Sequence, residues 1–262
     1  MLRYLTALVA ALALAAGAGA ADKKLTIRWH GQSFFEIISS EGTRIVTDPH
    51  AIDAFGRQSV KADLVLCSHL HSDHTRLDVI EEKAKSDEKA KPKVIYGVKE
   101  DKGTASKYNW TNFDEKFKGI HVYSVGTYHD DEQGLKRGLN TVMIIEVDGY
   151  RIAHLGDLGH KLSDAQLKAI GKVDVLMVPI GGVYTLNGSD AKEVVEQIKP
   201  RYFILPMHYG IKGVYEDLLT TDEFLEDQTN VRKGNPEELT LDVGAEAPDK
   251  PEIVLPAWHG KK

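Results

Sequence analysis

Apolar runs that end in histidine or aspartate constrain the fold of this 262-residue chain more than any other feature. The run 64–68 leads directly into a cluster that contains His69, His71, Asp73 and His74. Three later apolar runs are followed by single residues of the same types: His129, Asp157 and His208. Strands of an α/β fold collect ligand-binding side chains at their carboxyl ends. The pattern therefore predicts strands that bring seven nitrogen and oxygen donors together.

The rest of the sequence alternates between strand and helix signals. Runs rich in β-branched and aromatic residues predict strands at 25–29, 34–38, 44–47, 63–67, 94–96, 121–125, 142–147, 150–154, 173–180, 202–205 and 252–255. Turn sequences at 40–42 and 148–149 join two pairs of these strands as hairpins. Because hairpins come early and strand–helix–strand units come late, we expect an α/β sandwich with mixed sheets.

Three helices are expected from capping and stop signals. They are one from Thr75 into the mixed-charge stretch 81–91, one from a Ser163–Gln166 capping box to Gly171, and one from Ser189 to Pro200. The segment after Gly234 contains several prolines and alternating charge. We expect it to be an irregular surface tail that contains one short strand, 252–255.

The first twenty residues have the features of a secretory signal peptide. Arg3 gives a short basic region, 5–16 is an apolar run, and 18–20 fits the small-x-small cleavage rule. The apolar run is shorter than a bilayer-spanning helix needs. We therefore expect residues 1–20 to be removed, residues 22–262 to form a single hydrolase-type domain, and the protein to be periplasmic or secreted.

Charge and cysteine content exclude several other classes. The chain has 33 basic and 39 acidic residues, and therefore a formal net charge of −6, so we expect no nucleic-acid partner. After cleavage no segment is apolar enough to predict a membrane partner. Cys67 is the only cysteine, so an internal disulfide cannot form. A small-molecule substrate is the expected partner, and the oligomeric state is left open.

The spacing within the histidine cluster suits two metal ions. Residues two apart in an extended segment project to the same side, so His69 and His71 can share one ion. Asp73 and His74 come after a turn and can hold a neighbouring ion, and a carboxylate such as Asp157 can bridge the two. Donors of this kind admit zinc, manganese or iron without choosing among them. Two divalent ions, with zinc as the first choice, are the expected cofactors.

The ordered set resembles the metallo-β-lactamase superfamily. The resemblance rests on His-x-His-x-Asp-His at 69–74, a later histidine, a Gly-Asp turn and a final histidine, over roughly residues 25–210. Four further motifs are similar to the branch of ascorbate-phosphate-lactonase-like hydrolases: Trp29-His30-Gly31, Thr47-Asp48-Pro49, Pro179-Ile180-Gly181-Gly182 and Pro206-Met207-His208-Tyr209. The sequence differs from that branch in its export signal, the loop 130–138 and its extended tail.

The resemblance implies a four-layer αβ/βα sandwich with two mixed β-sheets and assigns roles to the donors. One metal would be held by His69, His71 and His129, and the other by Asp73, His74 and His208, with Asp157 as the bridge. The catalytic residues would then be Asp73, His74 and Asp157. Asp48 is a candidate to support the ligands from behind.

Other residues near these motifs have more ordinary interpretations. A hydrogen-bonded structural role is expected for His154, and a small buried hydrophobe for Cys67. The role of His30 is open between support of the ligands and plain turn structure. Tyr184 and Tyr209 are candidate substrate contacts. Gly181-Gly182 either lets the backbone approach the ligand closely or forms a simple tight strand-to-helix loop.

Together these observations predict an exported metal-dependent hydrolase in which a dinuclear-metal-activated hydroxide attacks an ester-type bond, such as a lactone or phosphoester. A β-lactamase is one alternative, and a non-catalytic metal-binding periplasmic protein on the same fold is another. An iron-dependent redox enzyme is a third, although flavodiiron relatives carry Glu where His71 stands here. No Gly-x-Ser-x-Gly nucleophile motif is apparent.

Overall fold

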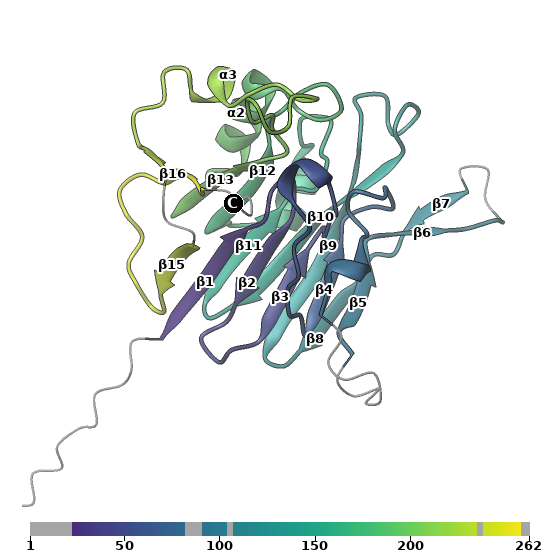
Figure 1. Cartoon of the computed structure of the whole chain (residues 1–262), viewed down its shortest axis with the longest axis horizontal. Helices are drawn as coiled ribbons and strands as arrows, with labels where there is room; N and C mark the ends of the chain where they lie inside the picture. Colours follow the sequence, from purple (N-terminus) through teal and green to yellow (C-terminus); the bar gives the residue numbers. More distant parts are fainter. Residues whose placement is uncertain (1–22, 82–90, 104–106, 235–237, 258–262) are drawn as a thin grey trace, which may run out of the picture.

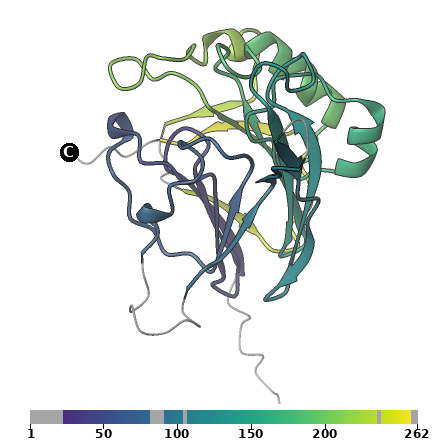
Figure 2. The ribbon, with the colours of Figure 1, turned by 90° about the vertical axis from the view of Figure 1, so that its right-hand side faces the viewer.

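Two β-sheets face each other and enclose the core of the molecule (Figures 1 and 2). The computed structural model describes residues 23–81, 91–103, 107–234 and 238–257. The first sheet has six strands in the order β15-β1-β2-β3-β4-β5. Their bounds are Lys24–Trp29 (β1), Phe35–Ile38 (β2), Arg44–Thr47 (β3), Leu64–Cys67 (β4), Lys93–Tyr96 (β5) and Glu238–Asp242 (β15).

The second sheet has eight strands in the order β14-β16-β13-β12-β11-β10-β9-β8. Their bounds are Asp114–Phe117 (β8), Ile120–Tyr128 (β9), Leu139–Val147 (β10), Tyr150–His154 (β11), Val175–Pro179 (β12), Phe203–Met207 (β13), Val231–Lys233 (β14) and Glu252–Leu255 (β16). Both sheets combine antiparallel hairpins with parallel pairs, such as β3–β4 and β11–β12. The predicted α/β sandwich with two mixed sheets is therefore confirmed.

Side chains of β4 show why its sequence is almost entirely apolar. Leu64 and Leu66 point into the main core between the sheets, while Val65 and Cys67 join a smaller cluster on the outer face of the first sheet. A strand buried on both faces needs apolar residues at every position. The strand ends at the edge of the sandwich, where the next residues begin the histidine cluster.

Helices cover the outer side of the second sheet (Figure 2). They are α1 (Asp164–Ile170), α2 (Gly188–Ile198) and α3 (Asp222–Leu225). The capping box of Ser163 with Gln166 and the stop at Gly171 are confirmed in α1. The predicted cap of α2 was wrong, because the side chain of Asn187 accepts the backbone N–H of Asp190. Among the described residues, no helix is long and apolar enough to cross a membrane.

In the described residues, short 3-10 turns and loops, rather than α-helices, cover the outer face of the first sheet. Two 3-10 turns, η1 (Asp53–Phe55) and η2 (Leu77–Val79), lie there with the loops around them. The predicted helix from Thr75 was wrong at its start, because the chain leaves η2 at Ile80 to form a β-bridge with Val60. The greater part of the charged stretch 81–91 lies outside the described residues.

The carboxyl-terminal segment contributes more regular structure than expected. Strand β16 has the predicted bounds, but β15 also pairs with β1, and its leucines alternate into the core. A separate two-stranded hairpin, β6 (Val98–Glu100) with β7 (Tyr108–Trp110), projects from the sandwich (Figure 1). The expected signal peptide, residues 1–20, lies outside the described residues.

Candidate metal centre

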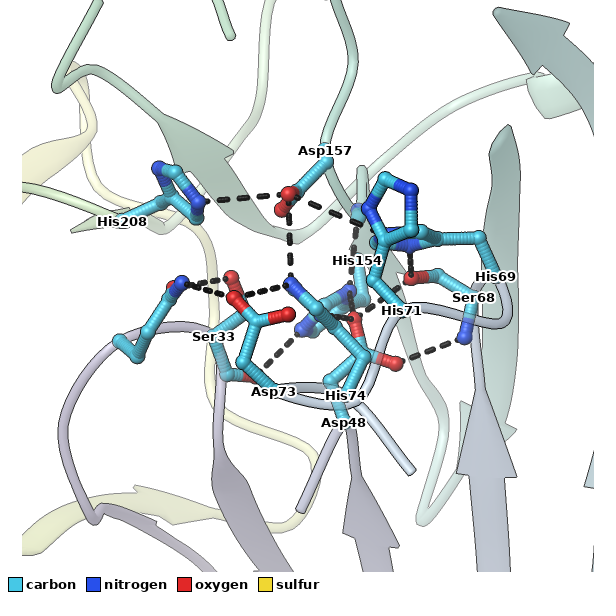
Figure 3. A network of polar contacts seen from close by, with 12 residues as sticks. Ser33, Asp48, Ser68, His69, His71, Asp73, His74, His154, Asp157 and His208 are labelled. Carbon is cyan, nitrogen blue, oxygen red and sulfur yellow. Dashed lines mark hydrogen bonds and ion pairs between the residues drawn. The ribbon is translucent and has the colours of Figure 1, made fainter. Parts of the chain in front are cut away.

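All seven predicted donors lie together at one edge of the sandwich. Figure 3 labels six of them: His69, His71, Asp73, His74, Asp157 and His208. The segment 69–74 follows β4, His129 follows β9, Asp157 follows β11, and His208 follows β13. Both sheets therefore contribute to the same site. His71 is exposed, Asp73 is half-buried, and the other five side chains are buried.

The carboxylate of Asp157 lies at the centre of this group. Its Oδ2 is 3.1 Å from Nε2 of His129 and 3.2 Å from Nε2 of both His74 and His208. Nε2 of His69 is 3.8 Å from the same oxygen. Four imidazole nitrogens from three separate segments thus point at one carboxylate oxygen, which is the position expected of a bridging ligand.

The donor atoms form three overlapping groups, each with all its atoms within 4.8 Å of one another. The groups are His69–His71–His129, Asp73–His74–His208 and His69–His74–Asp157. The first two correspond to the two predicted ligand sets, and the third links them through Asp157. Coordination by these residues remains a prediction, but the geometry it requires is present.

Hydrogen bonds behind the site fix which nitrogen of two histidines carries a proton. Asp48 is buried and 3.0 Å from Nδ1 of His74, so that nitrogen donates. The hydroxyl of Ser68 donates to Asp48 at 2.7 Å and must therefore accept from Nδ1 of His69 at 2.9 Å. The neutral ring of His69 consequently presents an unprotonated Nε2 to the centre of the site. Burial acts to lower the pKa of His74, but Asp157 and Asp48 raise it well above its ordinary value, so Nε2 of His74 must release a proton before it can bind a metal.

This arrangement fits a bound cation. Nε2 of His69 is 3.0 Å from Nδ1 of His71, so His71 either donates to His69 from a protonated Nδ1 or presents a second lone pair to the same cation. Oδ1 of Asp157 is buried and has no hydrogen-bond partner among the described residues. Buried polar atoms without partners are costly, and coordination to a metal would satisfy them.

Ionisation of the central residues also favours positive charge in the site. Burial alone would raise the pKa of Asp157, but His208, His74 and hydrogen bonding hold it well below its ordinary value. Burial, followed by the neighbouring His74, lowers the pKa of His69 well below its ordinary value, which keeps that imidazole neutral. Neutral imidazoles and an ionised carboxylate are the forms that bind metals.

Close backbone packing places two of the donors. The backbone N–H of Asp157 donates to Asn140 at 2.9 Å, and a Cβ on Gly156 would lie 2.4 Å from the same amide oxygen. A Cβ on Gly181 would lie 2.1 Å from the carbonyl oxygen of His208. The close approach of Gly181 is to the backbone of His208 and sets the position of that donor, while an approach of Gly181-Gly182 to a bound ligand stays a prediction.

The structure also shows the surroundings of three neighbouring residues, His154, His30 and Cys67. His154 donates to the carbonyl of Ser33 and accepts from the backbone N–H of Gly156, which confirms a structural role. His30 packs on Phe34 and approaches Glu36, away from the donors. Cys67 is buried, and burial raises the pKa of its thiol well above the ordinary value.

The two candidate substrate contacts have different outcomes. Tyr209 is buried and stacks on Trp29, so its prediction as a contact in the metal pocket was wrong. Tyr184 is about half exposed and lines a pocket of about 370 Å³ over the donors. The pocket is lined by His71, Asp73, His129, Lys136, Arg137, Asp157, Tyr184 and His208.

Sequence reasoning missed four residues around the site. Lys136 and Arg137 line the pocket, Asn140 holds the turn before Asp157, and the amide of Gln32 donates to Asp73 at 3.1 Å. The loop 130–138 was noted as unusual, and its two adjacent basic residues were the available signal. Asn140 and Gln32 lie in segments that contact the donors only after folding, so local patterns contain no signal for them.

Comparison with known proteins identifies the family. A family model described as a β-lactamase superfamily domain matches residues 26–208. The chain belongs to the metallo-β-lactamase superfamily. The superfamily prediction is thereby confirmed, while the ascorbate-phosphate-lactonase-like branch stays a prediction.

Individual relatives agree with this assignment. A UPF0173 protein of Pyrococcus furiosus is 33% identical over 71% of this chain and 84% of its own length. A UPF0173 metal-dependent hydrolase of Thermococcus onnurineus is 31% identical over 70% of this chain and 84% of its own. The crystal structure of a candidate zinc-dependent hydrolase of the superfamily from Thermotoga maritima has a TM-score of 0.61, with 30% identity over 88% of this chain and 98% of that one.

Proposed function

We propose that this protein is an exported hydrolase that uses two divalent metal ions to cleave an ester-type bond, such as a lactone or a phosphoester. The coarser statement, a metal-dependent hydrolase of the metallo-β-lactamase superfamily, rests on the family match and the similar hydrolases. The two-ion mechanism, the ester-type substrate and the export belong to the proposal.

One observation supports the two-ion mechanism above all others. Two sets of three donors flank Asp157, and the Nδ1 atoms of His74 and His69 donate to Asp48 and Ser68, which directs both Nε2 atoms at it. When bound, a pair of divalent ions would lower the pKa of a shared water towards about 7 and stabilise negative charge on the oxygen of the cleaved bond.

The residues of the chain then have separate tasks. Asp157 would bridge the two ions, because its carboxylate has two oxygens and faces both donor sets. Gln32 orients Asp73 by donating to its Oδ2, which keeps the half-buried carboxylate turned to the site. The pocket volume of about 370 Å³ suits a small molecule.

Replacement of a ligand tests this function. Asp157→Ala and His71→Ala each remove a proposed metal ligand. Loss of a residue that only hydrogen-bonds to a ligand typically reduces activity about 10–100-fold, so these two variants should lose more than that. Initial rates with a γ-lactone, bis(4-nitrophenyl) phosphate and nitrocefin would be compared for zinc-loaded and manganese-loaded protein. Circular dichroism would verify that each variant keeps its fold.

His121→Ala is the matched control. His121 pairs with Asp114 and Glu146 on the strands β8, β9 and β10 and does not belong to the donor set. Its activity should equal that of the wild type. Full activity in the Asp157 and His71 variants would refute the mechanism, and turnover of nitrocefin alone would replace the ester-type substrate with a β-lactam.

The export proposal rests on the basic, apolar and small-x-small regions of residues 1–20. Expression of the full chain in a bacterium should give a periplasmic or secreted product that begins at Ala21, as determined by intact mass. A cytoplasmic product of full length would contradict the proposed signal peptide.

A further inference from the structure

The loop 130–138 is held in one conformation beside the metal pocket. Asp130 is buried, and its carboxylate accepts four backbone N–H groups, from Glu132, Gly134, Lys136 and Arg137, at 2.7–3.0 Å. The backbone of Gly138 closes the loop by donating to Gly134 and accepting from His129. The loop is therefore anchored directly to a proposed metal ligand.

Two adjacent basic residues of this loop line the pocket with the donors. One N–H of Arg137 donates to the carbonyl of Val183 at 2.9 Å, and the guanidinium lies 5.7 Å from the ring centroid of Tyr184. Arg137 makes no ion pair within the described part of the chain. Its remaining N–H groups are available to a ligand.

Lys136 forms an exposed ion pair with Glu132 of its own loop, at 2.7 Å. Exposed ion pairs of this kind contribute little to stability, so the ammonium group can turn to a substrate anion at low cost. Two cationic side chains facing a pocket are unusual in a chain whose net charge is −6. Asp73 and Asp157 line the same pocket on the side of the donors, so Lys136 and Arg137 favour an anion on the side of the loop.

We propose that Lys136 and Arg137 form a subsite for an anionic oxygen group of the substrate, a carboxylate or a phosphate, that is separate from the bond being cleaved. This inference rests on the proposed function, because it places the reacting bond over the donors and the anionic group against the loop. The guanidinium fork matches the two oxygens of either anion.

The surroundings of the subsite indicate what links the two ends of the substrate. Leu135, Val183 and Tyr184 are exposed apolar side chains on the two loops that Arg137 connects. Of these, Tyr184 lines the pocket together with the donors and Arg137, so a hydrocarbon chain between the ester and the anion would lie against its ring. The substrate class is therefore an organic anion with an ester-type bond a few carbons from its charge.

A matched pair of esters tests the subsite. The zinc-loaded protein would be assayed with mono-4-nitrophenyl adipate, which carries a terminal carboxylate, and with 4-nitrophenyl hexanoate, its neutral counterpart. We expect a lower KM for the adipate ester. In the double variant Lys136→Gln/Arg137→Gln, KM for the adipate ester should rise about tenfold or more, because charge-assisted hydrogen bonds are lost, while kcat and the hexanoate reaction stay unchanged.

Lys116→Gln/Lys118→Gln is the matched control, because it removes the same charge from the exposed strand β8 and the turn that follows it. It should behave as the wild type with both esters. Equal KM values for the two esters, or equal effects of the two double variants, would overturn the subsite.

A binding measurement separates this inference from the proposed function. Calorimetric titration with phenylphosphonate should show about tenfold weaker binding to the Lys136→Gln/Arg137→Gln variant than to the wild type, with the control variant unchanged. If neither ester is hydrolysed but this difference is found, the ester-type reaction fails and the anion subsite stands. Equal phenylphosphonate affinities would overturn the subsite whatever the esters show.

Discussion

Asp48 illustrates how a single residue behind the site determines what the donors can bind. It is fully buried and accepts hydrogen bonds from the backbone and hydroxyl of Ser68 and from Nδ1 of His74. These three bonds orient the histidine cluster and fix the proton positions on His74 and, through Ser68, on His69. Partners of this kind tune the ligands they touch.

Asp48→Asn should weaken zinc binding by about 10–100-fold, because the amide cannot accept all three donors and the tautomer of His74 is no longer fixed. Competition with a coloured chelator would measure the zinc affinity. Asp148→Asn, which changes an aspartate that accepts hydrogen bonds from Ser40 and does not belong to the donor set, should bind zinc as the wild type does. An unchanged affinity in Asp48→Asn would show that this residue does not position the ligands.

His50 makes the stability of the fold depend on pH. Its Nε2 donates to the carbonyl of Gly31 and its Nδ1 accepts from the backbone of Ile52, both at 3.1 Å, so the buried ring is neutral. Burial lowers its pKa to about 4, although the Gly31 carbonyl acts in the opposite direction. Protonation would place a second N–H against the N–H of Ile52.

Because the unfolded chain binds this proton near pH 6.5 and the folded chain only near pH 4, the free energy of unfolding should fall as the pH drops through that range. The contribution of His50 is about 3 kcal/mol. Denaturant titrations between pH 7 and pH 4 would show it. The His50→Asn variant keeps an acceptor for Ile52, and its free energy of unfolding should depend less steeply on pH. An identical pH dependence in both proteins would reject the role of His50.

At the scale of elements, the site depends on how tightly the loop after β12 packs on the end of β13. Gly181→Ala should displace His208, since the new Cβ would lie 2.1 Å from its carbonyl oxygen. We expect a loss of about 1–3 kcal/mol in stability, as overpacking typically causes, together with weaker metal binding. Gly103→Ala, at an exposed turn, is the control and should change neither quantity.

Thermal unfolding and metal content would be measured on the same samples. A Gly181→Ala protein with wild-type melting temperature and wild-type metal content would contradict the close approach.

Elements with strong local signals could be predicted from the sequence. The apolar residues of β4, the capping box of α1 and the turn at 148–149 each depend on residues close together in the sequence. The structure contains all three. The helix from Thr75 was wrong because the pairing of Ile80 with Val60, a tertiary contact, replaces it. Strand β15 was missed because its pairing with β1 joins residues more than 200 positions apart.

The residues of the candidate site also fall into two groups, those that the sequence could predict and those that only the fold reveals. Donors grouped within 69–74 could be recognised from spacing alone, and the isolated donors from their places after strands. Gln32 and Asn140 act across long sequence separations, so only the folded chain shows that they orient Asp73 and Asp157. Tyr209 was misplaced because its neighbour His208 faces the pocket, while Tyr209 itself packs on Trp29.

At the scale of the whole molecule, the two sheets of the sandwich are joined at one edge by the donors themselves. Segment 69–74 belongs to the first sheet, while His129, Asp157 and His208 follow strands of the second. Several of these buried polar atoms have no hydrogen-bond partner among the described residues, which costs free energy that a bound cation would offset. The fold and the proposed metal centre are therefore energetically linked.

Counting the metal ions on the purified protein tests this account most directly. Native mass spectrometry of protein reconstituted with zinc should show two ions per chain in the wild type and fewer than two in Asp157→Ala, with His121→Ala retaining both. A wild-type chain that binds no zinc, manganese or iron, or an Asp157→Ala chain that still binds two ions with unchanged affinity, would contradict it.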